Sequence, residues 1–309
     1  MAHRTPGEHS PAGGEGHLPG HRRWLRKIPT APAFNVVDFT FDAYDRLLEA
    51  GAAADYRFLT VEEYLRSADR PERAIILRHD VDRRPATARA MAESEADHGV
   101  SATYYLRAPL FEPGFARELE ARGHEVGYHY EDLAAVEGDH AAARSRFDRN
   151  VARFRAHVDV STVCAHGSPL SPHDNRQFWE NGANLADWDL LGDAGLSLEH
   201  DSAAADSPRY FSDTGRTWGT EVPGYGRVST TGDLVEVLEN RLCDRCYVLA
   251  HPGRWAGTRT QLLSRVAWDV GAEGAKFTAR WVNRFVDAGE DASRRFRSDR
   301  PSADGLDSD

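Results

Sequence analysis

The stretch from 73 to 133 constrains the fold of this chain most, because apolar runs and helix-like segments alternate along it. Residues 74–77 are apolar and lead into a charged cluster at 78–82. An apolar run without alternation is typical of a parallel strand that is buried on both faces. A helix is predicted at 86–99, followed by a strand at 102–106, a helix at 114–122 and a strand at 125–129. This order predicts an α/β fold, in which functional groups gather at the carboxyl ends of the strands.

Metal-capable side chains follow two of these predicted strands. Asp80 and Asp82 stand two residues apart, which places them on one face if the strand continues through them. His129 ends the strand predicted at 125–129, so in a barrel Asp82 and His129 are expected to meet. A mixed carboxylate and imidazole set suits zinc or another divalent first-row metal. The alternative is structural: Asp80 caps a turn and His129 is a core histidine with satisfied hydrogen bonds.

Two motifs in this stretch resemble those of a known family. The sequences Arg78-His79-Asp80-Val81-Asp82 and Gly123-His124-Glu125-Val126-Gly127-Tyr128-His129 resemble the polysaccharide deacetylase superfamily, which is NodB-type and carbohydrate esterase family 4-like. The resemblance implies an irregular (β/α)7-type parallel barrel in a single domain. It also implies that Asp80 is the catalytic base and that Asp82 and His129 bind the metal. We expect this catalytic domain to span residues 34–289, between disordered tails at 1–33 and 290–309.

The second motif departs from the family pattern in one respect. The family has another histidine four residues beyond His129, and this chain has Leu133 there. A further strand is predicted at 161–165 and ends at His166, which we propose as the replacement third ligand. Glu131 and Asp132 are the rival candidates, being adjacent to the first histidine. The alternative for His166 is a hydrogen bond to loop backbone.

Further site residues are expected in the second half of the chain. The strand predicted at 246–250 ends at His251, where the family has a Leu-x-His motif whose histidine is the general acid. An imidazole suits this role because its pKa lies near neutrality. By position, Asp213 and Trp218 resemble supporting residues of the family's fourth motif. We expect these two residues and Arg78 to contact substrate.

The segment from 184 to 225 spaces aromatic residues among polar turn residues. Such spacing suits a rim that packs on the faces of sugar rings, or else an aromatic core beneath long loops. Elsewhere, helices are predicted at 41–48, 138–158, 172–181, 233–242 and within 258–288. Thr60 and Glu63 have the spacing of a capping box at a helix start.

The residues together predict metal-assisted hydrolysis of an amide, with zinc as the expected metal. The resemblance implies an N-acylated sugar or glycoconjugate as substrate. A hydrolase of a non-sugar C–N bond uses the same chemistry and remains an alternative. A second alternative is a non-catalytic domain that binds a glycan or a protein. The presence of Leu133 where the family has a histidine favours this alternative. Asp80 and His251 favour hydrolysis, because a binding module needs neither an acid nor a base.

Composition excludes several other classes. A formal net charge of -11 argues against binding to a nucleic-acid backbone. The chain has 3 cysteines, an odd number that does not predict a disulfide framework. Cys243 and Cys246 have the spacing of a metal knuckle, but no second pair completes a tetrahedral site. No apolar run is long enough to cross a membrane, and no signal peptide is evident, so a cytoplasmic location is expected. The sequence does not indicate an oligomeric state.

Overall fold

The computed structural model describes residues 38–198 and 207–267. The tails predicted at 1–33 and 290–309 lie outside the described residues, as does most of the helical segment predicted at 258–288.

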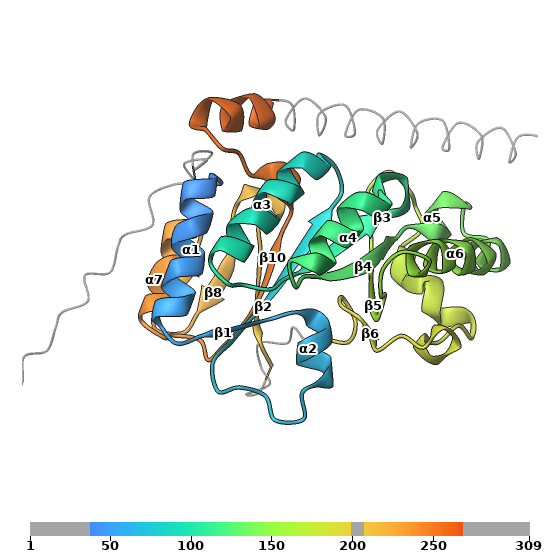
Figure 1. Cartoon of the computed structure of the whole chain (residues 1–309), viewed down its shortest axis with the longest axis horizontal. Coiled ribbons are helices and arrows are strands. Elements are labelled where there is room, and N and C mark those ends of the chain that lie inside the picture. Colours follow the sequence, from blue (N-terminus) through green and yellow to red (C-terminus); the bar gives the residue numbers. More distant parts are fainter. Residues whose placement is uncertain (1–37, 199–206, 268–309) are drawn as a thin grey trace, which may run out of the picture. The chain divides into compact units, whose positions relative to one another are not determined.

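An eight-stranded parallel sheet forms the centre of the fold (Figure 1). The strand order is β6-β5-β4-β3-β2-β10-β7, and β1 pairs with β2 beside this path. The sheet curls into an incomplete barrel with helices around it, which confirms the predicted (β/α)7-type architecture. The strands are β1 (Arg57–Leu59), β2 (Ala74–Val81), β3 (Thr103–Arg107), β4 (Glu125–Tyr130), β5 (Thr162–Ala165), β6 (Gly192–Asp193), β7 (Arg209–Ser212) and β10 (Arg245–Ala250).

Strand β2 is central, and all of its residues are buried, as its uninterrupted apolar run predicted. It pairs with β10 along one edge, and with β1 and then β3 along the other. Its alternate residues belong to two different cores. Ile75 and Leu77 pack in the cluster that includes the helix residues Leu47 and Phe147. Ile76 packs on the opposite face with Tyr105 and Tyr247, inside the curl of the sheet, where Arg78 and Asp80 also point.

The helices begin where the sequence supplies N-terminal signals. Thr60 and Glu63 form the predicted capping box at the start of α2. Pro85 and Pro113 occupy the first positions of α3 and α4, where a missing N–H costs nothing. The helices are α1 (Phe41–Ala53), α2 (Val61–Arg66), α3 (Pro85–Asp97), α4 (Pro113–Ala121), α5 (Asp132–Ala135), α6 (His140–Arg155) and α7 (Thr231–Glu239).

The second half of the fold is less regular than the first. The helix predicted at 172–181 is instead a 3-10 helix, Asn175–Asn181. The segment from 184 to 225 contains short elements: β6, β7, a 3-10 turn at Leu185–Trp188, and β8 (Thr220–Val222), which pairs antiparallel with β9 (Gly226–Val228) just beyond the segment. Within the described residues, no helix is both long and apolar enough to cross a membrane.

Gly127, in the middle of β4, is required by the packing inside the curl. A Cβ atom at this position would lie 2.3 Å from Cε1 of Tyr105 and 2.9 Å from the backbone oxygen of Thr162. The aromatic ring on β3 therefore occupies the space that a side chain on β4 would need. This contact explains the glycine of the second motif, two residues before His129.

Candidate metal and catalytic site

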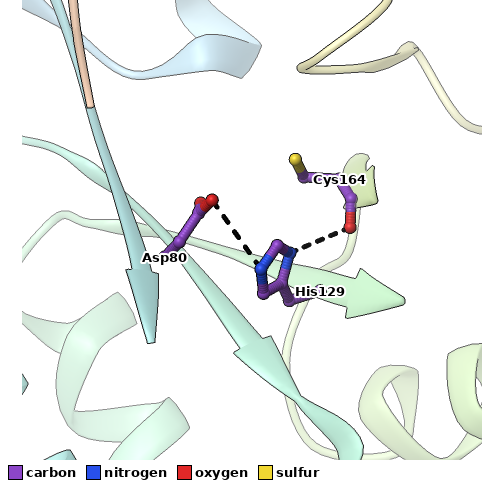
Figure 2. Close-up of side chains that lie close together, drawn as sticks. All are labelled: Asp80, His129 and Cys164. Atoms are coloured by element: carbon purple, nitrogen blue, oxygen red, sulfur yellow. Dashed lines mark hydrogen bonds and ion pairs between the residues drawn. The ribbon is translucent and has the colours of Figure 1, made fainter. Parts of the chain in front are cut away.

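The carboxyl ends of β2, β4, β5 and β10 carry the polar side chains of the site. Asp80 lies on β2, His129 on β4, and Asp82, His166 and His251 directly follow β2, β5 and β10. Parallel strands end at the same rim, so residues far apart in sequence meet there. Figure 2 shows the Asp80 carboxylate and the His129 imidazole pointing toward each other from their two strands.

Asp82, His129 and His166 form a group whose ligand atoms all lie within 4.8 Å of one another. Oδ1 of Asp82 is 3.4 Å from Nε2 of His129 and 3.5 Å from Nε2 of His166. This oxygen is buried and has no hydrogen-bond partner. A buried carboxylate oxygen without a donor is unfavourable, and a cation bound between the three side chains would satisfy it.

The two histidines are oriented by hydrogen bonds at their other ring nitrogen. Nδ1 of His129 lies 3.0 Å from the backbone carbonyl of Cys164 and donates to it (Figure 2). Nε2 is then the nitrogen that faces Asp82. Nδ1 of His166 lies 3.1 Å from Oγ of Ser168 and 3.4 Å from Oε2 of Glu131, and the backbone N–H of Ser168 is directed at it from 3.3 Å. In each case Nε2 is the nitrogen available to a metal.

Electrostatics around Asp82 favour its ionised form. Burial works to raise the pKa of this carboxyl, but His129, with help from His251 and His166, holds it well below the usual range. The reverse effect acts on His129, where Asp80 and Asp82 raise the pKa against the effect of burial. The site thus concentrates negative charge beside two imidazoles, as a divalent cation requires.

The two rival ligands occupy other places. Asp132 is fully buried, accepts a hydrogen bond of 2.7 Å from the hydroxyl of Tyr128, and faces Asn150 and Arg146. Glu131 lies behind His166 and pairs with Arg107 at 2.5 Å. His166, followed by Arg107, lowers the pKa of Glu131 to about 2 despite partial burial. Glu131 therefore orients a histidine, and Asp132, the first residue of α5, bonds to side chains of α6.

A second cluster, Asp80 with His129 and Cys164, also has metal-capable atoms within 4.8 Å of one another. Arg78 fills it. Its Nη2 atom donates to Oδ2 of Asp80 and to the sulfur of Cys164, each at 2.6 Å, and its Nε donates to Oδ1 of Asp80 at 2.7 Å. Because a guanidinium cannot lose its charge at neutral pH, it excludes a metal cation from this cluster. Of the two groups found among the described residues, the one around Asp82 is then open to a cation.

Arg78, which was expected to contact substrate, is buried beneath Asp80. Its side chain is 6% exposed, and its third donor, Nη1, reaches the hydroxyl of Tyr247 at 2.8 Å. All of these contacts lie inside the curl of the sheet. Burial works to raise the pKa of Asp80, but Arg78 and His129 hold it below its ordinary value, so this carboxylate is ionised at neutral pH.

His251 is oriented by Asp213, which is fully buried. The Asp213 carboxylate accepts a bond of 2.5 Å from Nδ1 of His251 and one of 2.8 Å from its backbone N–H. It also accepts from Arg254 at 3.0 Å and from the indole N–H of Trp255 at 2.9 Å. Burial works to raise the pKa of Asp213, yet His251 and Arg254 lower it. Asp213, expected to contact substrate, instead lies beneath the histidine.

Trp218, which was expected to bind substrate, is buried in the main hydrophobic cluster. It is 4% exposed, packs 5.9 Å from Phe39 between ring centroids, and donates its indole N–H to Thr231. Trp188 and Phe211 are buried as well. For these three residues the interpretation as an aromatic core holds, because all three belong to the main hydrophobic cluster.

Several site residues were not predicted from the sequence. Arg107 ends β3, and its Nη1 atom donates to the backbone carbonyl of Asp82 at 3.3 Å. Its place at a strand end was a usable signal, the same one that identified His129. Tyr247 and Arg254 had no such signal, because only the pairing of β10 with β2 and β7 brings them beside Arg78 and Asp213.

Comparisons with known proteins give matches among solved structures only. No family model matches the chain, and no curated protein matches it. A carbohydrate esterase family 4 pseudoenzyme from Bacillus anthracis is 14% identical, with 64% of this chain and 60% of that chain covered, at a TM-score of 0.40. The chain therefore spans less than two thirds of that protein.

Two further structures are similar to the same degree. A family 4 carbohydrate esterase from Streptomyces lividans, in complex with acetate, is 12% identical over 65% of this chain and 88% of that chain, at a TM-score of 0.39. The catalytic domain of a peptidoglycan N-acetylglucosamine deacetylase from Eubacterium rectale is 14% identical over 64% of this chain and 84% of that chain, at a TM-score of 0.40. These are proteins of the kind that the two strand-end motifs resemble. At such identities and scores they carry no conclusion about activity, which depends on the site itself.

Proposed function

We propose that this protein is a metal-dependent hydrolase that removes the acyl group from the nitrogen of an N-acylated carbohydrate. One observation carries the proposal. A buried carboxylate oxygen of Asp82 has no hydrogen-bond partner and lies within 3.5 Å of Nε2 of both His129 and His166. The carbohydrate part rests on the resemblance of the two motifs to polysaccharide deacetylases.

The three side chains fit a catalytic metal rather than a structural one. Two imidazole nitrogens and one carboxylate oxygen are donors that zinc accepts, and three protein ligands leave a position open for substrate. The imidazoles of His129 and His166 are fixed through their Nδ1 atoms, as metal-binding histidines commonly are. A divalent cation bound here polarises a carbonyl oxygen and lowers the pKa of a coordinated water.

Asp80 is the proposed general base. It is ionised, and the two-pronged contact with Arg78 fixes the plane of its carboxylate. Its Oδ2 atom lies 3.7 Å from Nε2 of His129, so it borders the proposed metal position without belonging to the ligand set. A proton taken from the attacking water goes to this carboxylate.

His251 is the proposed general acid. In the register of β10 and β2, Ala250 pairs with His79, so His251 stands beside Asp80 across two neighbouring strand ends. Asp213 holds Nδ1–H, which directs Nε2 away from the core and stabilises the imidazolium. That imidazolium gives its proton to the departing nitrogen, and the base and the acid thus come from adjacent strands.

Metal content of the purified protein tests the ligand set. We expect about one divalent ion per chain in the wild type. Asp82→Asn and His166→Ala should each lose most of it, whereas His140→Ala, which removes a half-buried histidine at the start of α6, should keep it. Retention of the ion in both ligand variants, or none bound after incubation with zinc, would overturn the proposal.

Release of acetate from N-acetylglucosamine oligomers tests the reaction. Asp80→Asn and His251→Gln should retain the metal and lose activity by about two to four orders of magnitude, the usual contribution of an acid or base. A protein that binds the metal and the oligomer but releases no acetate would instead be a binding domain. Hydrolysis of simple N-acyl amines in preference to the sugar would move the substrate to a non-sugar amide.

A further inference from the structure

The backbone of His166 is held at both of its polar groups. His166 is the first residue after β5, and its backbone N–H donates to the carbonyl of Tyr130 on β4 at 2.8 Å. Its backbone carbonyl accepts a bond of 2.7 Å from Nδ2 of Asn175. These two bonds fix the orientation of the peptide groups on either side of His166, and with it the direction in which the imidazole leaves the chain.

Asn175 connects the loop after β5 to the helix that follows β4. It is the first residue of the 3-10 helix Asn175–Asn181 and is 1% exposed. Its Nδ2 atom also donates to the hydroxyl of Ser168 at 2.9 Å, and its Oδ1 atom accepts a bond of 2.9 Å from the backbone N–H of Ala134 in α5. Because the backbone carbonyl of His166 can only accept, these partners define which way the amide faces.

Ser168 extends the effect of Asn175 from the backbone of His166 to its ring. Its φ angle is +29°, in the left-handed region that residues other than glycine adopt only at an energetic cost. The turn places the Ser168 hydroxyl 3.1 Å and its backbone N–H 3.3 Å from Nδ1 of His166. The bond from Asn175 to the same hydroxyl holds this turn in place.

A second contact holds the loop without reaching His166. A Cβ atom at Gly138, between α5 and α6, would lie 2.5 Å from Cε1 of His173, so the His173 ring lies directly on that turn. This contact does not involve the side chain of Asn175. Loss of that side chain should therefore release the His166 backbone while the loop stays packed on the protein.

We propose that Asn175 is a positioning residue that ties the loop after β5 to α5 and so fixes His166 in its place beside Asp82. His129 needs no such tie, because it lies within β4, which is paired with β3 on one side and β5 on the other. One histidine is thus held by the sheet and the other by an amide. The inference rests on the proposed function, in which His166 is a metal ligand.

The zinc affinity of the full-length protein tests this role. Zinc is titrated into the metal-free protein in competition with a chromophoric chelator, after circular dichroism has shown each variant to be folded. Asn175→Leu keeps the branched shape but removes three hydrogen bonds, and should weaken zinc binding by about 10–100-fold. Thr60→Ala, which removes the N-cap of α2, controls for lost stability and should bind zinc like the wild type. Equal affinities for Asn175→Leu and the wild type would overturn the proposal.

Asn175→Asp separates the two sides of the amide. It keeps an oxygen for the N–H of Ala134 but replaces the donor that faces His166 and Ser168. Its added negative charge favours a bound cation, so a weaker affinity must come from the lost donors. We expect zinc binding to weaken by about tenfold. An affinity equal to or above that of the wild type would show that the bonds to the His166 loop are not needed, against the proposal.

Hydrogen exchange of the metal-free protein separates this inference from the proposed function. Peptides that cover 166–175 should exchange faster in Asn175→Leu than in the wild type, whereas Thr60→Ala should leave them unchanged. If the wild type binds no zinc, the proposed function fails, and this exchange still decides whether Asn175 holds the loop. Unchanged exchange in Asn175→Leu would refute the tie. Faster exchange with unchanged zinc affinity would refute its role in placing His166.

Discussion

Replacing Asp213 by asparagine tests how the buried carboxylate supports His251. The substitution keeps the shape of the side chain but removes its charge and turns one acceptor into a donor. Asp213 accepts four hydrogen bonds, two of them from His251, one from Arg254 and one from Trp255. Each carboxylate oxygen accepts two of these bonds. The single oxygen of an asparagine can keep two of them, so the other two donors lose their acceptor.

The cost follows from the contacts that are lost. Hydrogen bonds to a charged group contribute about 1.5–3 kcal/mol each, and breaking a buried ion pair from one side costs about 3–5 kcal/mol. We therefore expect Asp213→Asn to lower the free energy of unfolding at pH 7 by about 3–5 kcal/mol. Urea unfolding followed by far-ultraviolet circular dichroism measures this difference. Asp174→Asn, at an exposed ion pair with Arg176, should lose less than about 1 kcal/mol.

The pH dependence of this loss has a definite sign. The pKa of Asp213 is lower in the folded protein than in the unfolded chain, so its ionisation stabilises the fold above the unfolded pKa, near 4. Below about pH 4 the wild type loses this stabilisation by about 1.4 kcal/mol per pH unit. The gap in free energy of unfolding between the wild type and Asp213→Asn therefore narrows. A gap that is the same at pH 7 and pH 3 would refute the ionised, paired state of Asp213.

The same variant has a separate effect on catalysis under the proposed function. Without the carboxylate, the imidazolium of His251 is less stable and its Nδ1–H has no anionic acceptor. We expect kcat for acetate release to fall by about two to four orders of magnitude while the metal content stays unchanged. A fall in metal content together with kcat would mean that the substitution disturbs the strand ends as a whole.

Three further outcomes are expected. The pKa of Asp132 is raised to about 6, so wild-type stability should fall by about 3 kcal/mol as the pH rises from about 4 to 6. Urea unfolding at both pH values should show that Asp132→Asn lacks this fall. The same dependence of stability on pH in the wild type and the variant would contradict the raised pKa of Asp132. Arg78→Lys keeps the charge beside Asp80 but loses the two-pronged contact, so thermal and urea unfolding should show a loss of about 2–3 kcal/mol. Gly127→Ala drives a methyl group into the Tyr105 ring, so urea unfolding should show a lower free energy of unfolding. A decrease below about 1 kcal/mol would mean that the ring moves aside freely.

Much of the fold was predictable because its signals are local. The apolar run of β2, the capping box at Thr60 and Glu63, and the prolines that open α3 and α4 each specify an element within a few residues. The segment from 184 to 225 was not predictable in the same way. Its strands are two to four residues long, too short for a period to show, and only their partners make them strands.

The sequence by itself determined which residue types stand at the ends of which strands, and so brought Asp80, Asp82, His129, His166 and His251 into one candidate site. Tertiary structure alone decided what each of them touches. Pairing between strands distant in sequence sets which side chains share a face, and packing sets which of them reach solvent. That is why Arg78 lies beneath Asp80 and Asp213 beneath His251, and why Trp218 lies in the core.

The choice among the three candidate ligands shows the same division. In the sequence, His166 was the proposed third ligand and Glu131 and Asp132 were its rivals, since each of the three follows a strand end. The pairing of β5 with β4 places His166 beside Asp82, the turn into α5 directs Asp132 toward Tyr128, and Arg107 holds Glu131 behind His166. Spacing along a chain defines candidates, whereas distances between side chains depend on how the whole sheet is assembled.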